Sequence, residues 1–248
     1  TILTYLLRPD HTWTVGFTEM NEFDWTDIAY ELLDSKHHKI IVSKGNFLET
    51  GEWMIKKRKE PLSVPNEILI YLMTKEVKKE NTVILSGEGA DELFWGYDRI
   101  FRWANSQEIL QISDFDEKYC YGSNLDDEVI DFALEDLPGN NTLEKIAYFF
   151  QIHHLHGLLR RVDNSTMLCS VEARVPFVDH RLIEMMIGAS FDWKMGCSFK
   201  EPLKRLYKGL IPQSIIDRKK IGFPVPLESI FSNKVDAKIA PMDAWLEY

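Results

Sequence analysis

Cysteine and long apolar runs are scarce in this sequence. Its 248 residues include three cysteines, Cys120, Cys169 and Cys197, which stand far apart and form no CxxC pair. Such spacing supports neither a disulfide framework nor a zinc ribbon and suits a reducing compartment, so we expect a cytoplasmic protein. No apolar stretch approaches the ~20 residues of a membrane span, and the first residues do not read as a signal peptide. We therefore expect no membrane partner.

Positive charge is also in the minority. Lysine and arginine total 29 against 39 aspartates and glutamates, which gives a net charge of −10. This balance disfavours nucleic-acid partners. One basic run, KKRK, stands at residues 56–59. We interpret it as the solvated end of a helix, with a phosphate or tRNA contact as the alternative. Two common nucleotide fingerprints, GxxxxGK[ST] and GxGxxG, are absent from the sequence.

The first part of the chain alternates strand and helix patterns. Strands are predicted at residues 12–17, 39–42 and 82–85, and helices at residues 2–7, 25–33 and 65–79. This alternation predicts an α/β fold, with a mostly parallel sheet flanked by helices over about residues 1–98. Strand signals then fade, so we expect residues 99–248 to be mainly helical. Helices are predicted at residues 126–134, 141–162, 181–187 and 202–209, with Asn141 and Glu144 as a capping box.

Residues 83–97, VILSGEGADELFWGY, concentrate the most chemistry in the fewest residues. An apolar strand opens here into glycines and then into the acids Asp91 and Glu92. This pattern predicts a ligand site at the carboxyl end of a strand. Glycine lets the backbone approach a ligand closely, and carboxylates hold metal ions or transfer protons. The alternative is a plain strand-to-helix turn whose acids favour the positive end of the next helix.

Other segments carry a family resemblance when they are taken together. They are TVGFTEMNEFD at residues 14–24, EP at 60–61, SVEARVPFVDHRL at 170–182 and RKKIGFPVPL at 218–227. With LSGEGADELFWGY at residues 85–97, they resemble, in order, motifs of the synthetase domain of glutamine-dependent asparagine synthetases. That domain is part of the PP-loop ATP pyrophosphatase family. Each motif alone is weak, but the combination is highly specific and runs from about residue 12 to 227. It implies an adenine-nucleotide alpha-hydrolase-like fold and one synthetase domain over residues 1–248.

The resemblance implies a carbon–nitrogen ligase that uses ATP and Mg²⁺. Such an enzyme activates a carboxylate as an acyl-adenylate with release of pyrophosphate, and an amine then displaces AMP. By motif position, backbone groups of Val15, Ser86 and Gly87 would hold the adenosine. Glu88 matches the acid linked to forming and using the acyl-adenylate. Asp91 matches the acid that helps to hold magnesium on the pyrophosphate.

A lysine would complete the implied site. Lys200 begins KEPLK, where relatives show KxxLR, and it would neutralise charge in the adenylation transition state. Lys204 is its structural competitor. We expect Glu88, Asp91 and Lys200 to converge on one cleft. Four other residues fall on family positions: Arg161, Asp163, Glu172 and Arg174. Their roles stay open, and one interpretation is that they form ion pairs that support the cleft.

Two departures from the family pattern bear on function. The family's SGGxDS loop does not occur, while residues 1–7 resemble the helix that follows it. We expect this PP-loop, and a glutaminase domain that supplies ammonia, to lie upstream; a scaffold that has lost the loop is the alternative. Leu62 and Pro65 also stand where bacterial asparagine synthetases place polar substrate contacts.

These departures leave the substrate open. Conversion of aspartate to asparagine is the leading reading, with amidation or cyclisation of another carboxylate, as in β-lactam synthetases and lasso-peptide cyclases, as the alternative. The resemblance is also compatible with a homodimer. Three histidines, at positions 153, 154 and 156, invite a zinc hypothesis, but they lack a matching cysteine or acid partner. We interpret them as partly buried helix residues.

Overall fold

A computed structural model describes residues 1–31, 33–119, 127–196, 199–218 and 222–231. It contains two compact units. Unit 1 comprises Thr1–Ile84, Arg161–Ala173 and the described part of residues 208–248; unit 2 comprises Leu85–Arg160 and Arg174–Tyr207. Several residues discussed above lie outside the described ranges: Cys120, Cys197, Lys219 and Lys220.

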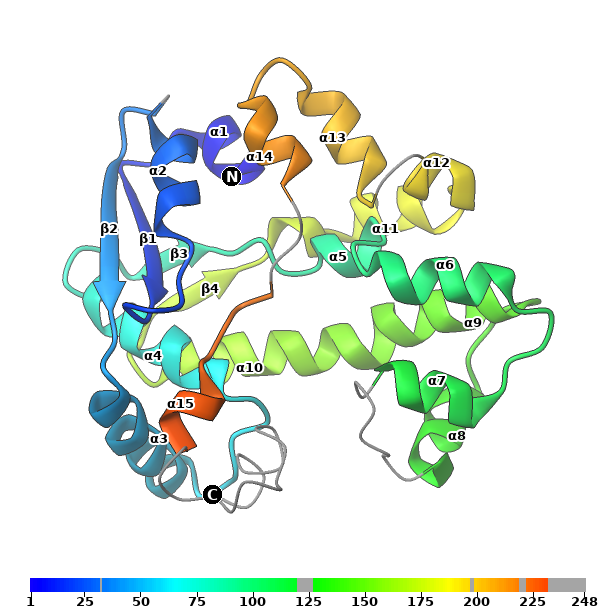
Figure 1. Cartoon of the computed structure of the whole chain (residues 1–248), viewed down its shortest axis with the longest axis horizontal. Helices are drawn as coiled ribbons and strands as arrows, with labels where there is room; N and C mark the ends of the chain where they lie inside the picture. Colours follow the sequence, from blue (N-terminus) through cyan, green and yellow to red (C-terminus); the bar gives the residue numbers. More distant parts are fainter. Residues whose placement is uncertain (32, 120–126, 197–198, 219–221, 232–248) are drawn as a thin grey trace. The chain divides into compact units, whose positions relative to one another are not determined.

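Unit 1 contains a parallel pair of strands. Strands β1 (His11–Gly16) and β2 (Lys36–Ile41) run in parallel, with Val15 opposite Ile40. The connection between them contains α2 (Phe23–Tyr30), as a parallel pair requires a crossover. Helix α1 (Ile2–Leu7) precedes β1, and Figure 1 shows the two strands side by side. The predicted α/β class with parallel strands is confirmed.

Helix α3 (Lys44–Arg58) was not among the predicted elements. Its buried positions, Phe47, Thr50, Gly51 and Met54, follow helical spacing, but two of them carry no apolar side chain. Position 51 has little room for a side chain, because a Cβ there would lie 2.8 Å from Ile68 Cδ1. The helix ends in the basic run, where cations favour the negative end of a helix. The interpretation of residues 56–59 as a helix end is thus confirmed, but it was wrong to expect all of them to be solvated, because the Arg58 side chain is 10% exposed and forms ion pairs.

The core of unit 1 forms around α4 (Asn66–Val77). Almost every side chain from Glu67 to Leu72 is buried on this helix. Ile68 and Leu69 are fully buried and pack with Phe17 and Phe47. Each such side chain contributes roughly 1.5–3 kcal/mol on burial. Helix α15 (Leu227–Phe231) adds apolar side chains to this cluster, and α14 (Gln213–Asp217) completes the described helices of the unit.

Unit 2 is mainly helical. Its core is rich in aromatic rings, with Phe101, Phe115 and Phe150 almost fully buried. The N-cap half of the predicted capping box is confirmed, because Asn141 Oδ1 accepts from the Glu144 amide at 2.9 Å; the Glu144 side chain instead accepts from the amide of Asn140, one residue before the N-cap. The helices are α5 (Ala90–Leu93), α6 (Asp98–Ser106), α7 (Ile112–Tyr119), α8 (Asp127–Glu135), α9 (Thr142–Phe149), α11 (His180–Ile187), α12 (Phe191–Met195) and α13 (Glu201–Tyr207), with a 3₁₀ turn, η2 (Pro176–Val178).

The helix predicted at residues 141–162 has an irregular middle. Between α9 and α10 (Leu155–Met167) lies a π-helical turn, η1 (Phe150–His154). Single π turns inside helices are rare and frequently occur at functional sites. This turn carries His154, whose contacts are described below.

A short pair of strands was only half predicted. Strand β3 (Val83–Leu85) agrees with the sequence, but its partner β4 (Glu172–Arg174) falls in the part expected to be helical. Two of the three residues of β4 are charged, so it carries no apolar signal. The Ser86 amide donates to the Arg174 carbonyl at 2.8 Å, just beyond β3. Tertiary pairing therefore decides this strand, as is common for β structure.

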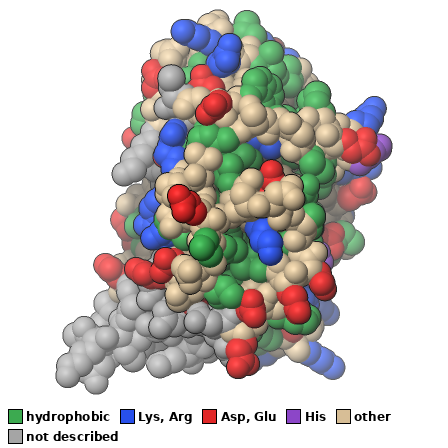
Figure 2. Space-filling view, turned by 90° about the vertical axis from the view of Figure 1, so that its right-hand side faces the viewer, with side chains coloured by type: hydrophobic (Ala, Val, Ile, Leu, Met, Phe, Trp, Pro, Cys, Tyr) green, Lys and Arg blue, Asp and Glu red, His purple; other side chains and the backbone are tan. Residues whose placement is uncertain are grey.

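The surface agrees with the acidic composition. On the face drawn in Figure 2, acidic side chains gather in the lower part, and hydrophobic side chains are exposed across the middle. None of the helices within the described ranges has both the length and the apolar character needed to cross a membrane.

A buried ion pair closes the loop between α3 and α4. Glu67 is fully buried, and Arg58 Nη1 donates to its Oε2. The amide and hydroxyl of Ser63 both donate to Glu67 Oε1 at 2.7 Å. Arg58 also pairs with Glu60. The EP segment of the sequence is thus anchored by charge-assisted hydrogen bonds inside unit 1.

We expect Glu67→Ala to lower the free energy of unfolding by about 3–5 kcal/mol, because it leaves buried donors and part of the Arg58 charge without a partner. Denaturation in urea, followed by circular dichroism, measures this change. Glu76→Ala is the matched control, since Glu76 pairs with Lys79 on the surface, and such pairs contribute roughly 0–1 kcal/mol. Equal losses in the two variants would contradict a special role for Glu67.

Candidate functional site

The loop after β3 holds the predicted site residues of unit 2. Ser86, Gly87 and Glu88 connect β3 to α5, and Gly87 is exposed whereas Ser86 and Glu88 are half-buried. Gly89 begins α5 with a φ of 88°, a left-handed conformation that favours glycine. A Cβ at Gly89 would also lie 2.5 Å from Val178 Cγ2. The two constraints explain why this turn requires glycine at position 89.

Asp91 and Lys200 meet although they are far apart in the sequence. Lys200 Nζ lies 2.9 Å from Asp91 Oδ1, and both side chains are about one-quarter exposed. Lys200 has a φ of 54° directly before α13. Left-handed backbone costs a non-glycine residue roughly 1–2 kcal/mol and tends to occur at functional sites. The competitor Lys204 instead places its ammonium 3.7 Å from the centre of the Phe199 ring.

Gly96 provides the space in which this ion pair forms. Its amide donates to the Asp91 carbonyl at 2.7 Å, which folds the chain back after α5. A Cβ at position 96 would lie 1.7 Å from Asp91 Oδ1 and 2.5 Å from Lys200 Cε. Any side chain here therefore displaces the two charged groups. The sequence motif includes this glycine, but the motif does not indicate which side chains the glycine contacts.

A buried carboxyl lies beside this pair on α5. Glu92 is 1% exposed, and the Tyr97 hydroxyl donates to its Oε1. Tyr97 also hydrogen-bonds His154 Nε2 at 3.1 Å, and Tyr119 contacts His154 Nδ1 at 2.9 Å. Burial raises the pKa of Glu92, and the nearby charges of Asp91 and Glu88 raise it further. The pKa of Tyr97 is also raised, mainly by burial.

The histidine cluster was only partly understood from the sequence. His154 is half-buried within the Tyr97 network, but His153 and His156 are exposed, so the prediction that all three are partly buried was wrong for two of them. A helix with a π turn rotates residues out of regular spacing, and the sequence pattern gives no sign of that turn. No group of three or more metal-ligating side chains occurs among the described residues.

Val15 lies in unit 1 and not in unit 2. It is buried at the carboxyl end of β1 and lines a hollow of about 150 Å³ together with Trp13, Asn21 and Phe223. The following Gly16 is tightly packed, since a Cβ there would lie 2.6 Å from Asn21 Cβ. The VGF segment thus forms a strand end beside a small pocket.

Of the family-position residues with open roles, Arg161 and Arg174 make contacts that hold backbone or loops in place. Arg161 Nη1 donates to Asn66 Oδ1 at 3.3 Å within unit 1. The Arg174 carbonyl receives the Ser86 amide, as described above. Asp163 lies on α10 and accepts from Thr166 through its carbonyl, and Glu172 begins β4. The Arg161 contact thus supports unit 1, and the bond from the Ser86 amide to Arg174 fixes the start of the loop after β3.

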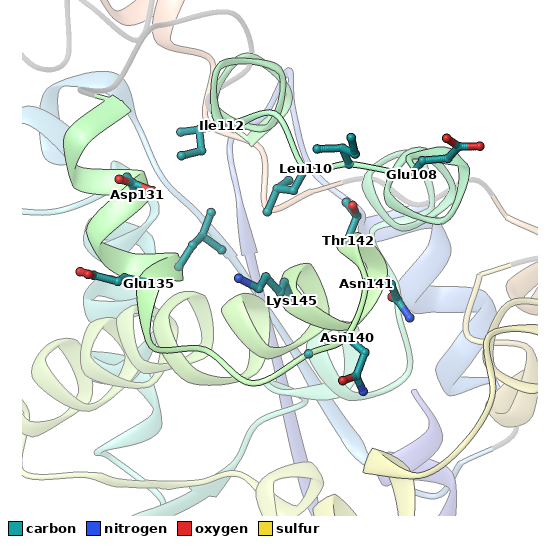
Figure 3. A pocket seen from close by; sticks show the side chains of 12 residues that line it. Glu108, Leu110, Ile112, Asp131, Glu135, Asn140, Asn141, Thr142 and Lys145 are labelled. Carbon is teal, nitrogen blue, oxygen red and sulfur yellow. The ribbon is translucent and has the colours of Figure 1, made fainter.

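A separate open pocket of about 380 Å³ lies among α7, α8 and α9. Figure 3 shows Asp131 and Glu135 on α8 and Lys145 on α9 at its walls. None of the predicted site residues lines it. Its walls mix charges of both signs without convergence on one point.

The parallel strands, the glycine-and-acid loop and the Asp91–Lys200 pair define an α/β protein with a charged site beyond the end of a strand. The chain belongs to the asparagine synthase family, whose profile matches residues 2–242. The resemblance noted from the motifs is thereby confirmed, as is the adenine-nucleotide alpha-hydrolase-like fold.

Individual relatives are similar at modest identity. The chain is 26% identical over 246 residues to asparagine synthetase [glutamine-hydrolyzing] 3 of Bacillus subtilis (strain 168), covering 87% of this chain and 40% of that protein. Asparagine synthetase [glutamine-hydrolyzing] 1 of the same organism is 26% identical over 284 residues, covering 91% and 44%. The Gallus gallus asparagine synthetase [glutamine-hydrolyzing] is 25% identical, covering 80% and 31%. The chain thus spans less than half the length of these relatives.

The raised pKa of Glu92 predicts that the free energy of unfolding depends on pH. The unfolded carboxyl titrates near 4.5 and the folded one at higher pH, so the folded chain holds its proton longer. The free energy of unfolding should therefore fall as the pH rises from 4.5 towards neutrality. Glu92→Gln keeps an acceptor for Tyr97 but cannot ionise, so its stability should fall less over this range.

Urea titrations of both proteins at several pH values measure this difference. Glu76→Gln, which alters an exposed carboxyl on α4, is the control. Parallel pH curves for the wild type and Glu92→Gln would disprove the assignment to Glu92.

Proposed function

We propose that this chain is the synthetase domain of an enzyme that converts aspartate to asparagine with ATP and glutamine-derived ammonia. The observation that carries the proposal is the ion pair between Asp91 and Lys200, next to the Ser86–Gly89 loop. Membership of the asparagine synthase family supports ATP-dependent amidation as the type of chemistry. The proposal includes a glutaminase domain and a PP-loop upstream of residue 1, as the family resemblance implies.

The proposed chemistry has two steps. A carboxylate oxygen attacks the α-phosphorus of ATP, and pyrophosphate leaves with the electrons of the broken P–O bond. Ammonia then attacks the acyl carbon, gives up a proton, and AMP leaves. Lys200 would neutralise negative charge that develops on the phosphates, because a fixed cation needs no reorganisation during the reaction. Glu88 would position or deprotonate the nucleophile.

Backbone groups of three residues would bind the nucleotide, as their motif positions imply. Val15 would contact the adenosine from the hollow at the end of β1, and Ser86 and Gly87 would contact it through the loop after β3. The exposed Gly87 has open space around its Cα, with no atom within 4 Å of an added Cβ. A ligand can therefore approach that backbone directly.

Asp91 fits magnesium as one ligand among several. Mg²⁺ is usually held by one or two carboxylates plus substrate phosphates and waters, not by a cage of protein groups. The described residues form no cage of three ligands, so Asp91 would provide the hard oxygen and the phosphates of ATP the others. When bound, the ion would lower the cost of charge transfer to the leaving pyrophosphate. A cytoplasmic location and a homodimer are part of the same proposal.

A second substrate class has an observation in its favour. Leu62 and Pro65, which stand near the family's polar substrate contacts, are both buried, and Leu62 belongs to the core of unit 1. They contribute packing in place of polar recognition. An enzyme of this family that amidates or cyclises another carboxylate is therefore the alternative, and a scaffold without catalysis is the third reading.

Pyrophosphate release by the complete protein that contains this chain tests the proposal. With ATP, Mg²⁺ and ammonia, we expect release to require aspartate and asparagine to accumulate in equal amount. Release with another carboxylate but not with aspartate would reject the first substrate and support the second. No release with any carboxylate, from a protein with an intact PP-loop, would favour the scaffold.

Gly96→Ala tests the arrangement of the site. The new methyl group must push apart Asp91 and Lys200, which are flexible side-chain ends, so the fold should survive with a modest change of about 1–3 kcal/mol. Activity should fall by at least about 100-fold, which is the effect of losing one preorganised charged group. Gly157→Ala, on α10 with no atom within 4 Å of its added Cβ, is the control and should keep full activity.

Lys200→Met should match the loss in Gly96→Ala, because both changes remove the same ion pair. Near-normal activity in Gly96→Ala would show that the Asp91–Lys200 contact is dispensable.

A further inference from the structure

A second cavity of unit 2 contains a buried cation. It has a volume of about 270 Å³ and is lined by Trp95, Lys194 and Gln151 among others. Lys194, on α12, is only 2% exposed. None of Glu88, Asp91 and Lys200 lines this cavity. It therefore holds a charge that the proposed amide chemistry does not use.

Lys194 has no carboxylate partner among the residues that the structure describes. Burial lowers the pKa of its ammonium to about 8, and no acid counteracts this shift. The group is still mostly protonated at neutral pH, so a largely uncompensated cation faces the cavity. Lysines are almost never fully buried without a partner, because removing the ammonium from water is costly.

Trp95 makes a favourable contact with the buried ammonium, and its own indole N–H has no acceptor among the described residues. Lys194 Nζ lies 4.4 Å from the centre of the Trp95 ring, a cation–π contact that offsets part of the burial cost. The indole Nε1–H of Trp95 is buried and has no acceptor within the described part of the chain. Trp95 itself is 4% exposed. Trp95 and Lys194 thus line the same cavity, and among the described residues neither the indole N–H nor the ammonium has a hydrogen-bond acceptor.

Glu144 borders the cavity but is occupied elsewhere. Its Oε2 accepts from the backbone amide of Asn140 at 2.8 Å and from the Asn140 side chain at 3.3 Å. This carboxylate therefore holds the residue that precedes the N-cap of α9. The remaining walls include the apolar side chains of Ala147 and Ile187.

We propose that this cavity binds a compact carboxylate, with one oxygen on the Lys194 ammonium and the other on the Trp95 indole N–H. A carboxylate is planar and singly charged, which matches one cation and one neutral donor in a partly apolar cavity. A phosphate dianion would need more donors than the two that lack acceptors here. The volume lies just below the ~300–1,000 Å³ of typical ligand pockets, so the ligand is of metabolite size.

Isothermal titration of the full chain with formate, acetate and propionate, each as its sodium salt, tests this proposal. At least one should bind with saturation at one site, and sodium chloride at equal ionic strength should not reproduce the heat. Lys194→Met should weaken binding by at least about tenfold, since it removes the charged donor while keeping a side chain of similar length. Trp95→Phe should weaken it as well.

Lys145→Met is the matched control, because Lys145 lies on α9 in the pocket of Figure 3 and not in this cavity. Its affinity should equal that of the wild type. Equal affinity in Lys194→Met, or no saturable binding by any of the three carboxylates, would overturn the proposal.

Thermal unfolding separates a ligand site from a purely structural lysine. Without ligand, Lys194→Met should unfold at a higher temperature than the wild type, because it removes an uncompensated buried charge. The saturating carboxylate should then raise the unfolding temperature of the wild type and not that of Lys194→Met. A variant that is less stable than the wild type and still gains from the carboxylate would show that Lys194 serves the fold alone.

Discussion

The contact of Asp91 and Lys200 across the backbone of Gly96 is the constraint on which the site of unit 2 depends. The aspartate belongs to α5 and the lysine directly precedes α13, so two distant segments must be brought to one point. Only a residue without a Cβ leaves room for both charged groups at that point. The left-handed backbone of Lys200, a non-glycine residue, shows that the chain accepts strain to form this arrangement.

Three buried ionisable side chains differ in how well neighbouring groups compensate their charge. This difference distinguishes residues that stabilise the fold from residues that can take part in binding or proton transfer. Glu67 is surrounded by donors from Arg58 and Ser63, so it stabilises a loop and needs nothing more. Glu92 has Tyr97 as a donor, yet burial still raises its pKa, which leaves a carboxyl that readily holds a proton. Within the described ranges, the ammonium of Lys194 contacts only the aromatic face of Trp95. Because an uncompensated buried charge costs free energy, its presence supports the proposal that a ligand binds beside it.

Much of the fold and part of the site could be predicted from local pattern. The parallel strands and the N-cap at Asn141 agree with the structure, and Lys200 lies beside Asp91, although its charge-neutralising role stays a prediction. Helix α3 and strand β4 could not be predicted, because their buried or paired positions carry glycine, threonine or charged side chains. The π turn at Phe150–His154 likewise has no signature, so the contact of His154 with Tyr97 was missed.

The sequence by itself determined the family, the α/β class and the residue types of the site, because ordered motifs and hydrophobic periodicity are local properties. Tertiary structure alone decided which of these residues meet. It paired Asp91 with Lys200, and it placed Val15 beside a hollow in unit 1. It also brought Lys194 and Trp95 to one cavity, where neither the ammonium nor the indole N–H has an acceptor from the residues that the structure describes. Burial and contact between distant segments arise from packing, which no single stretch of sequence encodes.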